Sequence, residues 1–361
     1  MANRLSGPAE LGWDDWFEQR MTCGSEDGVA RVAAVDREQL VLVDSSGAFR
    51  ARLAGRYLHH HGLADDMPCV GDWVCVERQP EDGFGVVHAL LERRTALRRR
   101  SAGDAAEQQM IAANVDCVVV VQSCHLDFNV RRLERYLVMV LDGGADPYVL
   151  LTKKDLVEPS VLASQLDEAR AAGITGPVLA LSNVTQDGVD DLRRSLEPGR
   201  TYCFVGSSGV GKSTLINHLL GDDVLETRDV GAAGKGRHTT TRRELIRLEG
   251  GALVIDNPGM REFGMVDADG GMEIGYSDIG EFASGCRYRD CSHTNEPGCA
   301  VLEAVESGAL SREHFENYLK LRKESEHYRR SAAERRQKER DFGKHVRQVK
   351  RDLKKRGKKG W

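Results

Sequence analysis

The chain has 361 residues, 40% of them hydrophobic and 30% charged, a composition typical of a soluble protein with room for two or three domains. No early apolar run resembles a signal peptide and no apolar stretch is long enough to span a bilayer, so we expect a cytoplasmic protein without a membrane partner. The nine cysteines, spread from Cys23 to Cys299, are odd in number and sparse, which favours reduced thiols or metal ligands over disulfides.

Short alternating segments between residues 28 and 97 predict a small all-β barrel. The candidate strands, among them GVARVAAV, QLVLVD and GDWVCVERQ, are separated by turn residues such as DSSG and PEDG. About five strands in roughly 70 residues fit an OB-type (oligonucleotide/oligosaccharide-binding) barrel, although this spacing does not exclude other small barrels.

The pattern changes after the basic link RRTALRRRSAG. VDCVVVVQS is continuously apolar, NVRRLERYLVMVLDGG has helical spacing, and buried strands then alternate with helices as far as ALVIDNPG. This alternation predicts a doubly wound parallel α/β domain, whose ligands bind beyond the carboxyl ends of the strands.

A candidate base-binding motif, TKKD at residues 152–155, ends the strand YVLLTKKD. Guanine presents its N1–H and N2–H₂ donors side by side, and an ionised Asp155 accepts from both, whereas adenine offers an acceptor there. Lys153 would lie along the base plane. Backbone near Ser182 and Asn183, after the next strand, could donate to guanine O6. Alone, the four-residue motif is a weak signal.

The stretch GSSGVGKST, from Gly206 to Thr214, follows the strand TYCFV and opens the helix KSTLINHLL. This is the pattern and context of a phosphate-binding loop, in which backbone N–H groups and a helix N-terminus bind phosphate oxygens. Lys212 would reach the β and γ phosphates, and Ser213 would bind Mg²⁺. The alternative, a glycine-rich turn without a ligand, does not require the lysine and serine that follow the glycines.

Two later segments are suited to sense the γ phosphate. The HTTT run, from His238 to Thr241, can supply Thr240 as a second Mg²⁺ ligand, and the alternative is a solvated turn or an edge strand. The strand ALVIDNPG places Asp256 for water-mediated Mg²⁺ contact and the Gly259 N–H for a hydrogen bond to the γ phosphate. Such segments become ordered with the triphosphate and are released on hydrolysis.

The stretch CRYRDCSHTNEPGC contains four candidate metal ligands, Cys286, Cys291, His293 and Cys299. Three thiolates and an imidazole suit a closed tetrahedral Zn²⁺ site with a structural role, since the protein fills all four positions. The spacing is not the commonest for a zinc finger, and disulfides are the alternative.

The end of the chain begins with apolar residues near helical spacing, such as Phe315 and Tyr318, and is then almost entirely charged. From Lys320 to Trp361 there are 18 Lys and Arg against 6 Asp and Glu, a net of +12, although the whole chain carries −5. A solvated helix is one interpretation. Concentrated positive charge on an acidic body also favours phosphate backbones, and beside an OB-type barrel we prefer RNA binding, through shape and backbone.

The order of the motifs is informative, because ordinary GTPases place the phosphate loop before the base motif. Here the base motif comes first, so the chain looks like a circularly permuted GTPase. On the stretches DFNVRRLERYL, GSSGVGKST, GRHTTT and DNPGMREF it resembles the bacterial ribosome small subunit-dependent GTPase A family, which acts in late maturation of the 30S subunit. The resemblance runs from about residue 28 to the tail and implies a matching zinc module and 16S rRNA as the RNA.

The resemblance also assigns the site residues. The expected GTP-binding residues are Thr152, Lys153, Lys154, Asp155, Ser182, Asn183, Gly206, Ser207, Ser208, Gly209, Val210, Gly211, Lys212, Ser213, Thr214, Asp256 and Gly259. The expected catalytic residues are Lys212, Thr240 and His238, the last because Met260 stands where a water-orienting Gln is usual and a thioether is a poor hydrogen-bonding group.

Two positions depart from the family pattern. Thr152 replaces the usual Asn of the base motif, which could weaken contacts that brace the phosphate loop. Asn183 stands where Ala is usual, and we expect little loss there because the backbone makes the contact.

We therefore expect a multidomain monomer that binds GTP and GDP, one Zn²⁺ and Mg²⁺, and that is a GTPase stimulated by the 30S subunit. An RNA-binding assembly factor in which GTP is only a conformational ligand is the alternative. The expected divisions are an extension (1–27), the OB-fold barrel (28–97), a circularly permuted GTPase domain (101–268), a zinc-binding module (269–310) and a basic helical tail (311–361).

Overall fold

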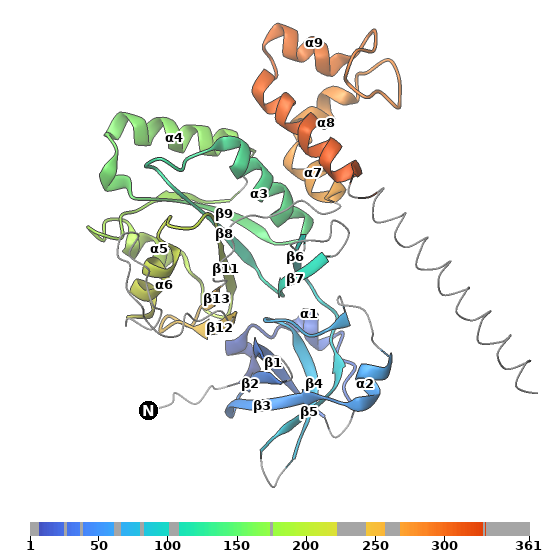
Figure 1. The fold of residues 1–361 in the computed structure, drawn as a ribbon, viewed down its shortest axis with the longest axis vertical. Coiled ribbons are helices and arrows are strands. Elements are labelled where there is room, and N and C mark those ends of the chain that lie inside the picture. Colours follow the sequence, from blue (N-terminus) through green and yellow to red (C-terminus); the bar gives the residue numbers. More distant parts are fainter. Residues whose placement is uncertain are drawn as a thin grey trace, which may run out of the picture.

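The computed structural model describes residues 7–24, 27–36, 39–60, 66–79, 83–100, 108–173, 176–221, 243–256, 268–327 and 329. Figure 1 shows a barrel (blue), an α/β domain (green to yellow) and a group of helices toward the C-terminus (orange to red), which we call the C-terminal module and which comprises residues 268–327. Within the described part of the chain, no helix is both long and apolar enough to cross a membrane.

The barrel is a closed sheet. Its strands are β1 (Gly28–Val35), β2 (Leu40–Asp44), β3 (Gly47–Leu53), β4 (Trp73–Arg78) and β5 (Gly85–Leu90). They run in the order β1-β2-β3-β5-β4, and β4 pairs again with β1. Helix α2 (Gly55–His60) follows β3, and Val32, Leu42 and Val74 fill the apolar interior. The predicted five-stranded barrel is confirmed.

The α/β domain contains one sheet. Its strands are β8 (Cys117–Ser123), β9 (Asp146–Thr152), β10 (Val178–Ala180), β11 (Thr201–Val205), β12 (Glu244–Arg247) and β13 (Leu253–Asp256). They lie in the order β10-β9-β8-β11-β13-β12, all parallel except β12. The predicted α/β fold is confirmed, and the strand before the phosphate loop, β11, is central.

Helices cover both faces of this sheet. On one face lie α3 (Val130–Asp142) and α4 (Pro159–Ala171), and on the other α5 (Val189–Ser195) and α6 (Lys212–Leu220). Val118 and Val120 of β8 belong to the apolar cluster that includes α3, whereas Val119 and Val121 belong to the cluster that includes α5 and α6. A strand buried on both faces needs the continuous apolar run seen in the sequence.

One strand pairing and one β-ribbon connect the barrel to the α/β domain. Strand β12 pairs with β1 through Glu244 and Ala34, so the two sheets are continuous. A two-stranded ribbon, β6 (Ala96–Arg100) and β7 (Gln108–Ala113), leads from the barrel toward β8. The sequence did not predict β6, β7 or β12.

The chain before β1 packs across this junction. It contains η1 (Pro8–Leu11) and α1 (Asp15–Glu18), and the rings of Trp13 and Phe17 contact Trp73 of β4 with centroids 4.8 and 6.0 Å apart. Glu10 pairs with Arg247 of β12 at 2.9 Å. This segment therefore touches both the barrel and the α/β domain.

Arg31 of β1 is buried beneath that segment, with 1% of its surface exposed. Its guanidinium donates to the backbone carbonyl oxygens of Leu11, Gly71 (3.1 Å) and Asn114 (2.8 Å). Burial lowers the pKa of Arg31 to about 10, and the nearby Asp116 opposes this effect. One side chain thus bonds to the N-terminal segment, a barrel loop and the start of the α/β domain.

A disulfide also holds the N-terminal segment. Cys23 is bonded to Cys75 of β4 with an S–S distance of 2.09 Å. The prediction that the scattered cysteines are reduced was therefore wrong for this pair, because the N-terminal segment returns to the barrel wall. Among the described residues the remaining seven cysteines are free thiols, three of them in the Cys/His cluster.

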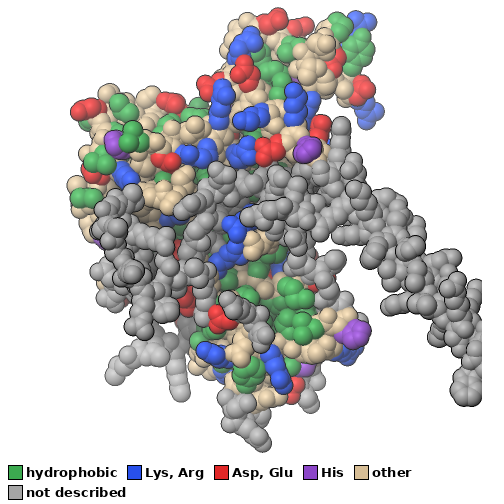
Figure 2. All heavy atoms as spheres, viewed as in Figure 1, with side chains coloured by type: hydrophobic (Ala, Val, Ile, Leu, Met, Phe, Trp, Pro, Cys, Tyr) green, Lys and Arg blue, Asp and Glu red, His purple; other side chains and the backbone are tan. Residues whose placement is uncertain are grey.

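The C-terminal module is helical. It contains α7 (Asp269–Gly275), α8 (Ser277–Ala283), α9 (Ala300–Ser307) and a further helix over residues 312–327. It packs on α3, and Figure 2 shows Lys, Arg, Asp and Glu side chains side by side where the two meet. Arg131 and Arg135 of α3 pair there with Glu313 and Glu324, at 3.0 and 2.8 Å.

Candidate nucleotide site and metal cluster

The phosphate loop leaves β11 and enters α6 through three glycines with positive φ. Gly206 has φ 146°, and a Cβ there would lie 2.2 Å from the carbonyl oxygen of Val121 in the neighbouring strand, so only glycine fits. Gly209 and Gly211 have φ 80° and 95°, and Gly211 is the N-cap of α6. Ser207, Ser208 and Val210 lie between these glycines, and Ser213 and Thr214 lie in the first turn of α6.

Lys212 is the first residue of α6, and its side chain folds back over the loop. Its Nζ donates to the carbonyl oxygens of Gly206 and Ser207, at 2.7 and 2.6 Å. Burial lowers the pKa of Lys212 to about 8, against the opposing charges of Asp256 and Asp127. A half-buried ammonium held by carbonyl dipoles is suited to bind an anion.

The base motif lies where β9 ends. Lys153 has the left-handed conformation, with φ 58°, and Asp155 follows in the short helix η3 (Lys154–Leu156). The Nζ of Lys154 pairs with the carboxylate of Asp187 at 2.8 Å. This ion pair ties the base motif to the loop that follows β10.

Two side chains link this base-binding side to the phosphate loop. Thr152 is fully buried, and its hydroxyl donates to the carbonyl oxygen of Val210 at 2.6 Å. The amide Nδ2 of Asn183 donates to the carbonyl oxygen of Gly211 at 3.0 Å. The contact that we expected Thr152 to weaken is thus made by its hydroxyl. Parts of the chain about 60 residues apart meet at one edge of the sheet, as parallel strands require.

Two more predicted residues lie at this end of the sheet, and three lie outside the described residues. Ser182 is buried, and its hydroxyl accepts hydrogen bonds from the N–H groups of Val184 and Thr185. Asp256 ends β13, the neighbour of β11. His238, Thr240 and Gly259 lie outside the described residues.

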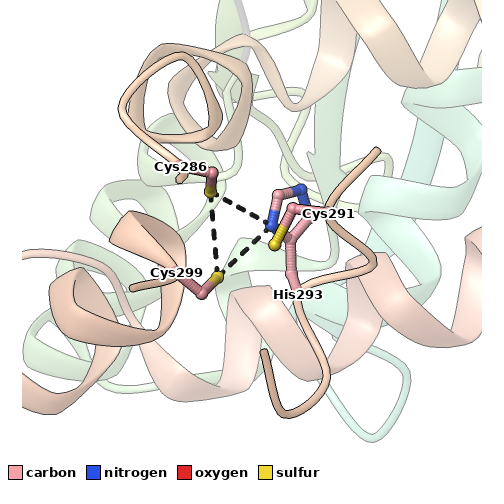
Figure 3. A group of neighbouring side chains, drawn as sticks. All are labelled: Cys286, Cys291, His293 and Cys299. Atoms are coloured by element: carbon pink, nitrogen blue, oxygen red, sulfur yellow. Dashed lines mark hydrogen bonds between the residues drawn. The ribbon is translucent and has the colours of Figure 1, made fainter. Parts of the chain in front are cut away.

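The four predicted metal ligands converge in the C-terminal module (Figure 3). The ligand atoms of Cys286, Cys291, His293 and Cys299 all lie within 4.8 Å of one another. The Sγ atoms of Cys286 and Cys299 are 3.8 Å apart, and His293 Nδ1 lies 3.6 and 3.4 Å from them. A tetrahedron with metal–sulfur bonds of about 2.3 Å has edges of about 3.8 Å, so the group can hold a metal ion.

The surroundings of His293 suit ligation. Burial lowers its pKa, which favours the neutral imidazole that binds metal. Arg322 of the helix over 312–327 donates to the carbonyl oxygen of Ser292 at 2.8 Å, and this contact fixes the ligand loop to that helix. The cluster therefore joins α8, α9 and the last helix into one unit.

Comparison with known proteins shows which family this chain resembles. The sequence profile described as RsgA GTPase matches residues 90–266. The small ribosomal subunit biogenesis GTPase RsgA of Opitutus terrae is 43% identical over 329 residues, 88% of this chain and 89% of that protein. The protein of the same name from Streptomyces coelicolor is 41% identical over 327 residues, 89% of this chain and 87% of the relative.

The chain belongs to the RsgA GTPase family. The predicted family and the predicted enzyme class, a GTPase, are thereby confirmed. The fold also matches the crystal structure of YjeQ from Thermotoga maritima, with TM-score 0.62 and 25% identity over 83% of this chain and 98% of that one. The structure of YloQ, described as a circularly permuted GTPase, matches with TM-score 0.60 and 26% identity over 85% and 98% of the two chains.

Several contacts of this RsgA-family site were not predicted from the sequence. Asp187 and Asp127 read as ordinary loop residues, yet Asp187 pairs with Lys154, and the charge of Asp127 partly opposes the lowering of the Lys212 pKa by burial. Gln122 bonds through its side chain to both the N–H and the carbonyl of Asn129. No motif marks these residues, because their partners are set by the folded sheet.

Proposed function

We propose that this protein hydrolyses GTP to GDP and phosphate with Mg²⁺, binds the rRNA of the small ribosomal subunit and acts in late 30S maturation in the cytoplasm. The proposal rests on the meeting of the base motif and the phosphate loop through the contacts of Thr152 and Asn183. The small subunit as partner is carried over from the names of the relatives.

A nucleotide would lie across the end of β8, which separates β9 from β11. Two strand spacings are about 10 Å, so base and phosphates would be bound by different strands with the ribose between them. Asp155 would accept from guanine N1–H and N2–H₂, Lys153 would lie along the ring, and the backbone at Ser182 and Asn183 would donate to O6. This pairing excludes adenine, which presents an acceptor to Asp155.

The phosphates would occupy the loop from Gly206 to Thr214. Backbone N–H groups of the loop and the first turn of α6 would bind the oxygens, and the Nζ of Lys212 would exchange its loop carbonyls for the β and γ phosphates. An anion beside a buried ammonium favours the charged form, so bound nucleotide would raise the depressed pKa of Lys212.

Hydrolysis would need the residues around the γ phosphate. Ser213 and Thr240 would be Mg²⁺ ligands, with Asp256 behind a water molecule. When bound, Mg²⁺ neutralises the charge that develops on the phosphate oxygens. The Gly259 N–H would bond to the γ phosphate, and His238 would orient the attacking water. Because Met260 cannot replace a water-orienting Gln, we expect slow turnover until the small subunit positions His238.

The remaining parts would serve the partner. Cys286, Cys291, His293 and Cys299 would hold one structural Zn²⁺ that fixes the C-terminal module. The barrel and the basic tail, with 18 Lys and Arg from Lys320 onward, would contact rRNA phosphates in a salt-dependent way, and the protein would act as a monomer.

Phosphate release from GTP and from ATP, each with and without purified small subunits, tests the proposal. We expect hydrolysis of GTP only, with a large increase on adding subunits and a further dependence on Mg²⁺. Equal rates with ATP would remove the guanine assignment. Subunit binding without added turnover would instead fit an assembly factor that uses GTP as a conformational ligand.

A further inference from the structure

The side chain of Asn183 makes a contact that its position in the sequence does not require. Asn183 begins the turn after β10, and the hydroxyl of the preceding Ser182 fixes this turn by accepting from two backbone N–H groups. Backbone donation to a base would need no side chain at residue 183. The amide instead crosses to the phosphate loop.

The contact reaches the residue that starts α6. Asn183 Nδ2 donates to the carbonyl oxygen of Gly211 at 3.0 Å. Gly211 has φ 95°, and a Cβ at Gly211 would lie only 2.6 Å from that same Nδ2. The amide therefore contacts the residue that directly precedes Lys212 and Ser213.

Thr152 makes the adjacent contact independently. Its hydroxyl bonds to the carbonyl of Val210, one residue earlier in the loop. The carbonyl oxygen of Gly211 also accepts the first hydrogen bond of α6, from the N–H of Leu215 at 3.0 Å. Asn183 adds a second hydrogen bond to the same oxygen, so the last residue before the helix is held from the base-binding side as well as by the helix.

The other end of the amide shows that this contact is not optimised for folding. Asn183 Oδ1 is buried and has no hydrogen-bond partner among the described residues. A buried acceptor without a partner is destabilising, so this Asn combines one useful hydrogen bond with one unfavourable atom. We therefore expect its net effect on the stability of the fold to be small.

We propose that Asn183 is a positioning residue that couples the guanine-binding loop to the phosphate loop. This inference rests on the proposed nucleotide site. It adds a side-chain role to Asn183, which we expected to act only through its backbone. Through the contact with Gly211, binding of guanine beside Asn183 would help to align Lys212 with the phosphates.

The test compares ligands that differ only in phosphates. Affinities for guanosine, GMP and GDP are measured by displacement calorimetry on the full chain, for wild type, Asn183→Ala and the isosteric Asn183→Asp. Guanosine contacts only the base side and reports damage to that side. Val184→Ala is the matched control, because Val184 is the next residue of the turn and its side chain is 84% exposed.

We expect Asn183→Ala to lower the affinity for GDP about three- to tenfold, which is the effect of one hydrogen bond. Its affinity for guanosine should stay within about twofold of the wild-type value. Asn183→Asp should weaken GDP further, because an acceptor would then face the Gly211 carbonyl. The melting temperature without nucleotide should barely change in Asn183→Ala, since the lost hydrogen bond is offset by removal of the buried oxygen. Val184→Ala should keep the wild-type ratio of GDP to guanosine affinity.

If Asn183→Ala lowers the affinities for guanosine and GDP equally, or lowers neither, the coupling role of Asn183 is refuted. Failure of the nucleotide site itself gives a different result, in which wild-type protein binds GDP and ADP equally. A wild type that selects GDP, together with an unaffected Asn183→Ala, refutes only the role of Asn183.

Discussion

Asp155 has an acceptor-only carboxylate and lies in η3, directly after β9, which makes its replacement informative. In Asp155→Asn one acceptor becomes a donor and faces the N–H groups of guanine. We expect GTP affinity to fall about a hundredfold or more, because two hydrogen bonds to a charged group are lost. Xanthine nucleotides, which carry a carbonyl in place of the N2 amine, should gain affinity. Fluorescence titration with GTP and XTP measures both.

The control is Asp167→Asn, which removes an exposed carboxylate of α4 that pairs only locally with Arg170. That variant should bind GTP and XTP as the wild type does. Unchanged selectivity in Asp155→Asn would show that this carboxylate does not contact the base.

For single residues, the sequence predicted which positions belong to the site better than it predicted the contacts that these residues make. Gly206, Gly211 and Lys212 are readable because a phosphate loop permits few alternatives at these positions. The consequence of Thr152 was not readable, since whether a short hydroxyl reaches Val210 depends on how closely β9 approaches the loop. The same holds for Asn183, whose partner is 28 residues away in the chain.

At the scale of elements, one histidine at the joint between α3 and the C-terminal module makes that joint sensitive to pH. His314 Nδ1 contacts the buried carboxylate of Glu134 on α3 at 2.6 Å, and its Nε2 contacts Asp278 of α8 at 3.3 Å. The ring of Tyr276 lies 4.7 Å from its own, between centroids. Burial lowers the pKa of His314, but the hydrogen bonds to Asp278 and Glu134 outweigh this and raise it to about 9.

This raised pKa predicts how the joint responds to pH. Because the folded pKa lies above the ordinary value of 6.5, the stabilisation is fully present below about pH 6.5 and is lost as pH rises through 9. This stabilisation amounts to roughly 3 to 4 kcal/mol at most. Hydrogen exchange of residues 268–327 between pH 6 and 9.5, corrected for the intrinsic rate, should show protection that declines over this window.

His314→Gln should remove most of that pH dependence, while His218→Gln, on the far helix α6, should leave it intact. Protection that stays constant to pH 9.5 in the wild type would contradict the ion-paired joint.

The cluster of Cys286, Cys291, His293 and Cys299 gives a second prediction at this scale. Cys291→Ala should lose the bound metal, because three ligands do not close a tetrahedron, and the ligand loop should become accessible to protease. Metal content by atomic emission and cleavage within residues 286–299 measure this. The control is Cys124→Ala, a buried thiol of the α/β domain, which should keep one metal ion per chain. Stoichiometric zinc in Cys291→Ala would refute the ligand set.

The elements that sequence patterns missed share a physical cause. Strand β12 has only four residues, and β6 and β7 form a short ribbon of five and six residues. None of the three strands is long enough to give a clear periodic signal. Arg31 sits in a strand whose alternation suggests a solvent-facing side chain. It is buried because the N-terminal segment covers the outer face of the barrel, and this long-range packing leaves no trace in local spacing.

For the whole molecule, the disulfide between Cys23 and Cys75 predicts a dependence of stability on reductant. The bond closes a loop with a sequence separation of 52, and constraint of the unfolded chain stabilises such a fold by about 4 kcal/mol in the chain-entropy estimate. Denaturant unfolding with and without reductant should differ by up to this amount. Cys23→Ser should abolish the difference.

A matched variant, Cys117→Ser, removes a buried thiol that is not in the bond and should retain the dependence on reductant. Counting thiols in unfolded, unreduced protein gives an independent answer. Nine reactive thiols would show that the bond does not form, and seven would support it.

The three-way bonding of Arg31 limits how the molecule can be divided. Its charge is neutralised by no contacting carboxylate in the described structure and is stabilised by carbonyls that belong to three different stretches of chain. A barrel excised before Asn114 would leave an NH₂ group of this guanidinium buried without its acceptor, or would have to open to admit water. We therefore expect a barrel excised before Asn114 to be less stable than the same barrel in the full chain.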